Sequence, residues 1–472
     1  MVDNLRKNIL GTNRLIWQAW GMTAPAADIA YLLGGIALVA LGATPLSILI
    51  GFLIYLAILN TSYRFSKKYV SAGSDFTYVG KSIGGFMATF EGWNLFFGTM
   101  FAYAGFGMLG LAGFFDIFDS GIITGGYWIP IVIALNVITF YILYRGIRFS
   151  TTYQIITGIA EFAILIAGGI GLVILAGKSN TLSVFSPFIA SGGIAGFLHS
   201  LTLSVVTFIG LSIALTAISE ETHIPKKTVP KSLLISSMII GITIVFLAYA
   251  MTVAWGPSRM ISFGDSVDNG LVLFREISPV MFILLFVFTV NSFMGNNISM
   301  GTSMTRIFYA FSRDNIIFPK AFSRTDRNGT PRNTTFLILG ISLFLSITFG
   351  LIFGPIDGGY VLLFADAFFS FLIRSISSGS LVISTFREGK MKAGALLGYL
   401  VIPLVSIGAL MAVLASNFFP LPVYPYNAAS VMGIVIIAAV FLITLYTWIK
   451  NPETVRKAGS TTIEEIAETS LD

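Results

Sequence analysis

Long apolar runs separated by short polar stretches recur along the whole chain of 472 residues. A helix needs about 20 consecutive apolar residues to cross a bilayer, and most of these runs reach that length. The pattern predicts an all-α membrane protein with twelve transmembrane helices. We expect them, with edges uncertain by several residues, at 15–41, 45–63, 84–115, 127–144, 150–176, 193–218, 232–255, 279–311, 334–353, 359–384, 394–415 and 428–449.

The first apolar run is interrupted by Gly21 and Pro25. Proline has no amide hydrogen, clashes with the preceding turn and pushes the residue before it away from helical angles. We therefore expect this helix to open near Thr23. Backbone groups without partners in hydrocarbon cost several kcal/mol each, so such a break survives only beside a protein-lined or water-filled cavity.

The sixth run carries a second expected interruption, around Gly210 in the stretch 207–212. Interrupted helices at corresponding places in two halves of a chain indicate a transporter's midplane binding site. We expect a five-helix repeat at 15–177 and an inverted one at 193–384, each opening with a broken helix. Helices 11 and 12 (394–449) follow. A cytoplasmic segment at 1–14 and an acidic tail at 450–472, disordered from residue 461 on, complete the chain.

Composition agrees with this class. Hydrophobic residues make up 55% of the chain and charged residues 11%, against about 25% charged in ordinary soluble domains. The chain has no cysteine and two histidines, which excludes disulfides and thiolate or histidine-cluster metal sites. We expect no cofactor or metal apart from a coupling ion.

The placement of the basic residues predicts a topology. With a cytoplasmic N-terminus and twelve spans, 24 of the 28 lysines and arginines fall inside, three fall outside, and Arg374 lies within a span. This is the distribution of the positive-inside rule. It predicts a multi-pass protein of the cell membrane with both termini cytoplasmic, and it accounts for the net charge of +6 without a nucleic-acid partner.

An ordered set of motifs accompanies the spans. The motifs are SAGSDFTYV at 71–79, IGGF at 83–86, EGW at 91–93, GIRFS at 146–150, FIGL at 208–211, EE at 220–221 with PKS at 230–232, and RIFYAFSRD at 306–314 with GTP at 329–331. In this order they resemble the amino acid–polyamine–organocation (APC) superfamily of transporters, over roughly residues 15–385. The resemblance implies a LeuT-like fold in which helices 1 and 6 bind an amino acid or amine through exposed backbone.

Two positions depart from the family pattern. TAPA at 23–26 stands where the family frequently has Gly-Ser-Gly. Ser212 stands where arginine and polyamine exchangers tend to carry a glutamate, just after the helix 6 glycine. The second departure counts against a dicationic substrate.

The two interruptions together predict a substrate cradle. N-termini of half-helices offer N–H groups to a substrate carboxylate, and carbonyls at their C-termini suit an ammonium or Na⁺. We expect Phe208 to act as an aromatic gate. The alternative is a pair of packing kinks, because proline and glycine are common in membrane helices. An unbroken helix at either place would contradict the paired cradle, whose predicted members are Met22, Thr23, Ala24, Pro25, Ala26, Thr207, Phe208, Ile209, Gly210, Leu211 and Ser212.

Five charged side chains fall within predicted spans: Asp28, Glu91, Glu161, Asp366 and Arg374. Each costs roughly 2.5–3.5 kcal/mol near the bilayer centre unless it is paired, protonated or hydrated. The resemblance implies that many relatives carry a lysine in place of Glu161, standing in for bound Na⁺. A carboxylate there would bind Na⁺ or take up a proton. We therefore interpret Glu161 as the coupling group, with a structural pairing to Arg374 as the alternative.

The other intramembrane charges have weaker assignments. Asp28 begins the half-helix after the break and is a candidate for a substrate ammonium or the ion, although a helix N-terminus also stabilises a carboxylate by itself. Asp366 and Arg374 are about 12 Å apart along a helix, so we expect Arg374 to meet an acid on another helix. Glu91 is expected to be structural. Three hydroxyls on helix 8 are further ion candidates, against the alternative of bonds to their own backbone: Ser299, Thr302 and Ser303.

These features predict a secondary active transporter of amino acids that works by alternating access and is driven by protons or, as second choice, Na⁺. A non-transporting nutrient receptor of the same fold and an amine or amino-acid exchanger are the alternatives. An enzyme is disfavoured, because no nucleophile–base or paired-acid motif lines a span. The expected partners are a small-molecule substrate and the lipid bilayer; the substrate and the oligomeric state stay open.

Overall fold

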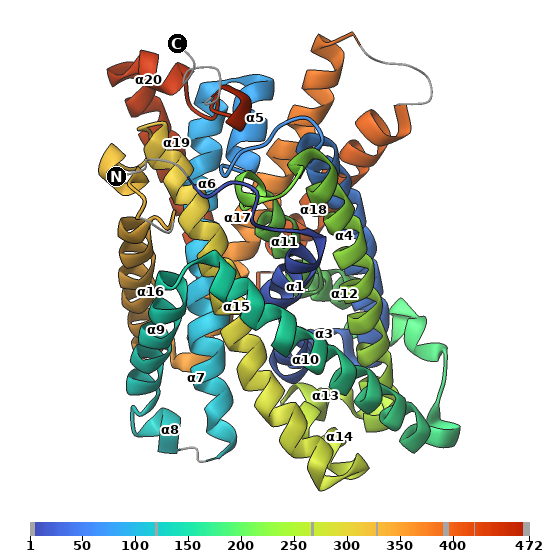
Figure 1. Ribbon diagram of the computed structural model, residues 1–472. Coiled ribbons are helices and arrows are strands. Elements are labelled where there is room, and N and C mark those ends of the chain that lie inside the picture. Colours follow the sequence, from blue (N-terminus) through green and yellow to red (C-terminus); the bar gives the residue numbers. More distant parts are fainter. Residues whose placement is uncertain are drawn as a thin grey trace.

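The computed structural model describes residues 5–118, 121–265, 269–326, 329–389, 396–419 and 421–465. These residues form a bundle of helices (Figure 1). Ten helical stretches among them are long and apolar enough to cross a membrane. The first stretch, Thr12–Ser66, holds two crossings that meet at Leu41, and the shorter apolar helix Trp128–Tyr144 adds one more. The predicted all-α membrane fold with twelve crossings is therefore confirmed.

The helices follow the predicted spans closely. The largest difference is α12, which begins at Pro225 rather than at 232, because proline is tolerated in a first helical turn. Residues 394–395 of the predicted helix 11 lie outside the described residues. Crossings 2 to 12 are, in order, α4 Thr44–Ser66; α6 Gly85–Ala102 with η3 Tyr103–Gly110 and α7 Leu111–Phe114; α9 Trp128–Tyr144; α10 Ile147–Ala176; α11 Ile194–Thr216; α12 Pro225–Trp255; α15 Pro279–Arg313; α16 Arg332–Phe353; α17 Pro355–Arg387; η12 Leu397–Val401 with α18 Ile402–Ser416; and α19 Asn427–Lys450.

The first crossing is broken as predicted. It consists of α1 Thr12–Thr23, the single turn α2 Pro25–Ala27, the π-helical turn η1 Asp28–Leu32 and α3 Leu33–Ala40. Ala24, between α1 and α2, adopts a left-handed conformation with φ 54° and ψ 61°. This conformation is strained for a residue with a side chain, and it persists only where the surrounding structure holds it.

The sixth crossing is not broken, so the predicted interruption at 207–212 is wrong. α11 is a continuous α-helix from Ile194 to Thr216. No proline lies within it, and a single glycine costs a helix only about 1 kcal/mol relative to alanine. Gly210 instead permits close packing, because a Cβ there would lie 3.0 Å from Cε of Met22 on α1. The paired-break cradle is therefore contradicted, and one break remains.

Several short helices lie outside the crossings. α5 Asp75–Ile83 and α20 Pro452–Arg456 lie at one end of the bundle, and α8 Gly121–Thr124, α13 Met260–Gly264 and α14 Asn269–Ile277 lie at the opposite end (Figure 1). α1 lies inside the bundle and packs against α10, α11, α12 and α15. The break is therefore surrounded by protein, as its unpaired backbone groups require.

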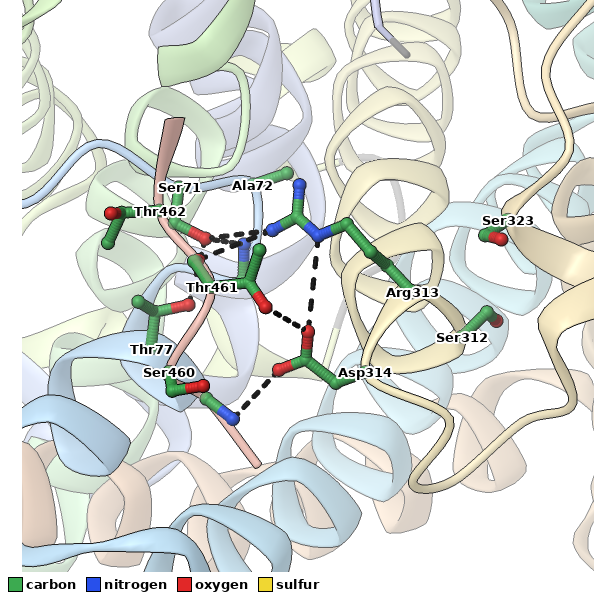
Figure 2. Close-up of polar contacts among 12 residues, drawn as sticks. Ser71, Ala72, Thr77, Ser312, Arg313, Asp314, Ser323, Ser460, Thr461 and Thr462 are labelled. Atoms are coloured by element: carbon green, nitrogen blue, oxygen red, sulfur yellow. Dashed lines mark hydrogen bonds and ion pairs between the residues drawn. The ribbon is translucent and has the colours of Figure 1, made fainter. Parts of the chain in front are cut away.

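Residues 451–465, which follow α19, dock on the α5 end of the bundle. Asp314, which follows α15, accepts hydrogen bonds from the Gly459 N–H at 2.9 Å and from Thr461 Oγ1 at 2.7 Å. Figure 2 shows the Asp314 carboxylate between Thr461 and Arg313. The N–H of Ile463 donates to the carbonyl of Val70 at 3.0 Å.

Two acids of the same segment form ion pairs. Glu464 pairs with Lys226 at 2.8 Å, and Glu465 pairs with Lys81. The prediction of disorder from residue 461 on is therefore wrong for 461–465, because the acidic side chains find lysines on the surface that they cover. Residues 466–472 of the tail and 1–4 of the N-terminal segment lie outside the described residues.

Candidate functional site

A cavity of about 70 Å³ lies beside the break in the first crossing. At roughly 10–15 Å³ for each water it has room for about five waters. Its walls come from α1, η1, α6, η3, α11, α15 and α17. Aliphatic and aromatic side chains make up most of the lining, and the polar side chains are Asp28, Asp366, Asn296, Thr23, Thr99, Thr207 and Ser370.

Side chains of α10 and α15 satisfy the backbone groups that the break releases. The carbonyl of Met22 accepts a hydrogen bond from Asn296 Nδ2 at 2.5 Å. The N–H of Ala26 donates to Glu161 Oε1 at 2.9 Å. Since both partners are side chains rather than helical backbone, the break is held open by specific contacts.

Glu161 is the side chain at the centre of this arrangement. It is only 2% exposed, and its Oε1 also accepts a hydrogen bond from Ser292 Oγ at 2.8 Å. No ion pair involves Glu161 within the described residues, so the alternative pairing with Arg374 is wrong. The carboxylate instead binds the N-terminal end of α2, where the helix dipole favours a negative charge.

The predicted cradle residues divide into two groups. Met22, Thr23, Thr207, Ile209, Gly210 and Leu211 line the cavity. Ala24, Pro25 and Ala26 form the break itself and are buried behind the lining, and Ser212 is also buried away from it.

Phe208 does not line the cavity. Its ring packs against Phe52 and Tyr55, with ring centroids 5.3 and 6.0 Å apart. On a continuous helix, residues one position apart point in different directions, so Phe208 faces α4 while Thr207 and Gly210 face the cavity. This position does not support the predicted role of Phe208 as a gate.

Arg374 meets an acid on another helix, as expected. Its Nη1 donates to Asp75 Oδ2 at 2.8 Å, and its Nη2 donates to the carbonyl of Ile209 at 3.0 Å. Ser377 Oγ donates to Asp75 Oδ1 at 2.7 Å and contacts Glu91 Oε1 at 3.4 Å. Glu91 belongs to this network rather than to the cavity, in keeping with its structural assignment.

Sequence reasoning missed Asp75 as the partner of Arg374. The predicted third span begins at 84, which places Asp75 in a loop. In the structure α5 folds back and packs against α17, and this buries Asp75 to 1% exposure. The available signals were the acid at Asp75 within the motif at 71–79 and the presence of an arginine, Arg374, within a predicted span that needed an acid from another helix.

The hydroxyl groups predicted as ion ligands on the eighth crossing lie on α15, and two of them form hydrogen bonds to backbone carbonyls. Ser299 Oγ donates to the carbonyl of Gln18, and Ser303 Oγ donates to the carbonyl of Ser299, both at 3.0 Å. None of Ser299, Thr302 and Ser303 lines the cavity. The side chains that reach the break are Ser292 and Asn296, which continue the same polar stripe at helical spacing; that spacing could have identified them.

Contacts between distant parts of the chain lie on both sides of the cavity along the bundle. Toward the α14 end, the rings of Tyr31 and Tyr360 stack with centroids 4.9 Å apart, and Tyr360 Oη donates to the carbonyl of Tyr31 at 3.0 Å. Toward the α5 end, Arg306 Nε pairs with Glu221 Oε2 at 2.9 Å. These contacts join neighbouring parts of the bundle on the two sides of the cavity.

The broken first crossing beside a protein-lined cavity is one part of the arrangement that the APC resemblance implies, whereas the second break that it also implies is absent from α11. A family model described as amino acid permease matches residues 16–446, most of the chain. The chain belongs to the amino acid permease family. The family and the relatives below are permeases rather than enzymes.

Two kinds of curated relatives are similar to this permease. The low-affinity putrescine importer PlaP of Escherichia coli strain K12 is 22% identical over 307 residues, which cover 63% of this chain and 66% of PlaP. The branched-chain amino acid permease BcaP of Bacillus subtilis strain 168 is 24% identical over 303 residues, which cover 60% of this chain and 62% of BcaP. This permease thus spans just under two thirds of the length of each.

A solved structure supports the fold. The structure of MhsT in complex with L-phenylalanine matches 88% of this permease and 100% of MhsT, with a TM-score of 0.56 and 16% sequence identity. MhsT has the LeuT fold, so the predicted LeuT-like fold is confirmed. At this identity the match carries the fold alone.

Proposed function

We propose that this permease is a secondary active transporter that moves a small amino acid or amine across the cell membrane by alternating access. A proton is the coupling ion, with Na⁺ as second choice. The names of its relatives support both substrate classes, because PlaP imports putrescine and BcaP is a permease for branched-chain amino acids. The family match and the protein-lined cavity support transport rather than catalysis.

The observation that carries this proposal is the hydrogen bond from the Ala26 N–H to Glu161 Oε1. An ionised carboxylate only accepts hydrogen bonds, whereas a protonated one also donates. Protonation of Glu161 therefore weakens its hold on the N-terminal end of α2. Because α2 adjoins the cavity-lining residues Thr23 and Asp28, a proton on Glu161 changes the wall that contacts the substrate.

Alternating access requires two closures that open in turn, and two contacts on opposite sides of the cavity are suited to this role. The Tyr31–Tyr360 stack joins the first crossing to α17, and the Arg306–Glu221 pair joins α15 to the segment after α11. A substrate enters when one set of contacts parts and leaves when the other parts. In the topology predicted by the basic residues, the α5 and α20 end is cytoplasmic, so the Arg306–Glu221 pair is the inner closure.

Uptake by the purified full-length permease in proteoliposomes tests this function. Labelled putrescine, leucine and a mixture of amino acids are offered under an imposed pH gradient, an imposed Na⁺ gradient or neither, with protein-free liposomes as the control. The proposal expects accumulation above equilibrium under the pH gradient. Binding of a substrate without movement of label would instead indicate a nutrient receptor. Equilibration that no ion gradient alters would indicate a facilitator, and uptake that requires unlabelled substrate inside the vesicles would indicate an exchanger.

A further inference from the structure

The cavity has an excess of acidic groups. Asp28 and Asp366 both line it, each only 4% exposed, and Glu161 lies directly behind the break. None of the described residues that line the cavity is basic. The arginine nearest along α17, Arg374, is paired with Asp75 instead. No ion pair in the described part of the chain engages Asp28 or Asp366.

The backbone donors expected for a substrate carboxylate are largely taken. At the first two positions of α2, Pro25 has no N–H and the N–H of Ala26 donates to Glu161. A carboxylate placed here would also meet the negative charge of Glu161. The sequence predicted that the N-terminal end of α2 binds the carboxylate of an amino acid. In the structure Glu161 already accepts the hydrogen bond that this end offers.

Two buried acceptor atoms in this cavity lack donors. Asp28 Oδ2 and Asn296 Oδ1 have no hydrogen-bond partner among the described residues. Both side chains line the cavity, and Asn296 is 6% exposed. A buried acceptor without a donor costs about 1–3 kcal/mol. These atoms therefore favour a bound group that donates hydrogen bonds, such as an ammonium.

The second acid belongs to a different wall. Asp366 lies on α17 and accepts a hydrogen bond from Ser370 Oγ at 2.8 Å through Oδ1. Most of the remaining lining is apolar and includes Leu32, Phe106 and Leu363. An aliphatic chain with a cationic group at each end matches a mostly apolar cavity with one acid on η1 and another on α17.

From this juxtaposition we infer that the substrate is a small aliphatic diamine, or a similar short dication, with one ammonium at Asp28 and Asn296 and the other at Asp366. The inference rests on the proposed transport function and names its substrate class. Two ammonium groups neutralise the two carboxylates, whereas a zwitterion leaves both charges uncompensated in a buried site. The sequence counted against a dication because Ser212 stands where polyamine exchangers tend to carry a glutamate. Asp366 on α17 provides an acid in the cavity instead.

Thermal shift and binding measurements on the purified permease test the inference with matched ligands. The probes are 1,4-diaminobutane, 1-aminobutane, which lacks the second amine, and leucine, which is zwitterionic. We expect the diamine to bind at least about tenfold more tightly than either of the others. Equal or tighter binding of leucine or 1-aminobutane would overturn the inference, and this comparison needs no variant.

Substitutions then locate the second ammonium. Asp366→Asn is expected to weaken diamine binding at least about tenfold and to change 1-aminobutane binding less than about threefold. The control is Asp357→Asn, which removes an acid of the same helix that bonds Tyr426 outside the cavity. If Asp366→Asn keeps the preference of the wild type for the diamine over 1-aminobutane, Asp366 is not the second site and the inference fails.

The outcomes separate this inference from the transport proposal. Gradient-driven uptake of leucine in preference to the diamine would support transport and refute the substrate class. Tight diamine binding that depends on Asp366, without any movement of label, would support the substrate class and refute transport.

Discussion

Arg374 on α17 and Asp75 on α5 form an ion pair of 2.8 Å inside the bundle, with side chains that are 2% and 1% exposed. The same arginine donates to the carbonyl of Ile209 on α11. One side chain thus links α5, α11 and α17 just beside the cavity. Removing one member of such a pair leaves the other as an uncompensated buried charge.

We therefore expect Arg374→Met to destabilise the permease by about 3–5 kcal/mol. Thermal unfolding in detergent checks this as a lower melting temperature. The double variant Asp75→Asn with Arg374→Met should recover part of the loss, because no lone charge stays buried. Arg148→Met, at an exposed position of α10, serves as the control. Equal melting temperatures for Arg374→Met and Arg148→Met would contradict the account.

A side chain added at Gly210 is predicted to fill part of the cavity and so to reduce substrate binding. A Cβ there meets only the flexible end of Met22 at 3.0 Å, so Gly210→Ala should fold and bind substrate with a modest loss. Gly210→Leu adds three more carbons against a cavity of about 70 Å³. We expect it to insert normally and to lose substrate binding by at least about tenfold.

The control for this series is Gly340→Leu on α16. Nothing lies within 4 Å of a Cβ at that position, which is exposed. Binding isotherms of the three variants in detergent provide the measurement. Wild-type affinity in correctly folded Gly210→Leu would place the substrate elsewhere.

Asp314 is predicted to hold the C-terminal segment on the bundle. Asp314→Ala removes the acceptor for the Gly459 N–H and the Thr461 hydroxyl, at about 1.5 kcal/mol or more for each bond to a charged group. The segment should then detach more often, and trypsin should cleave faster after Arg456 and Lys457. The rate of proteolysis in the native state checks this, with Glu453→Ala on α20 as the control. Unchanged cleavage would show that other contacts hold the segment.

Acid pH should loosen the same segment. Burial by itself would raise the pKa of Glu465, but the hydrogen bonds from Lys81 and the Thr462 N–H outweigh burial and lower the pKa. Because the pKa of Glu465 is lowered, its ionised carboxylate contributes fully to docking above about pH 4.3, the ordinary pKa of glutamate. That contribution is lost as the pH falls through the lowered pKa. Hydrogen exchange of the 457–465 backbone, corrected for intrinsic rates, should increase in that range and not above it.

The spans and the first break could be predicted from sequence because their causes are local. Twenty apolar residues make a crossing whatever surrounds them, and the chemistry of Pro25 interrupts a helix without help from tertiary contacts. The break at Thr23 and the cavity-lining position of Asp28 followed from these rules. The buried acids were also visible, because a charge within an apolar run stands out in any sequence.

The failures came from tertiary contacts. Gly210 was predicted to break its helix, but in the structure it allows close packing against Met22. No local sequence pattern indicates that contact. The sequence placed Asp75 in a loop, whereas in the structure it lies on α5, which packs against α17. Glu464 and Glu465 belonged to an acidic tail whose lysine partners are more than 200 residues away in the chain. In each case the deciding partner is distant in sequence.

Proton-coupled accumulation by Glu161→Gln is the measurement that tests the central claim most directly. Glutamine keeps an oxygen that can accept from the Ala26 N–H, but it cannot take up a proton. The account predicts that this variant still binds substrate and equilibrates it across proteoliposomes, while an imposed pH gradient no longer drives accumulation. Glu91→Gln, an equally buried acid outside the cavity, should keep its dependence on the gradient. Full gradient-driven accumulation by Glu161→Gln would contradict the account.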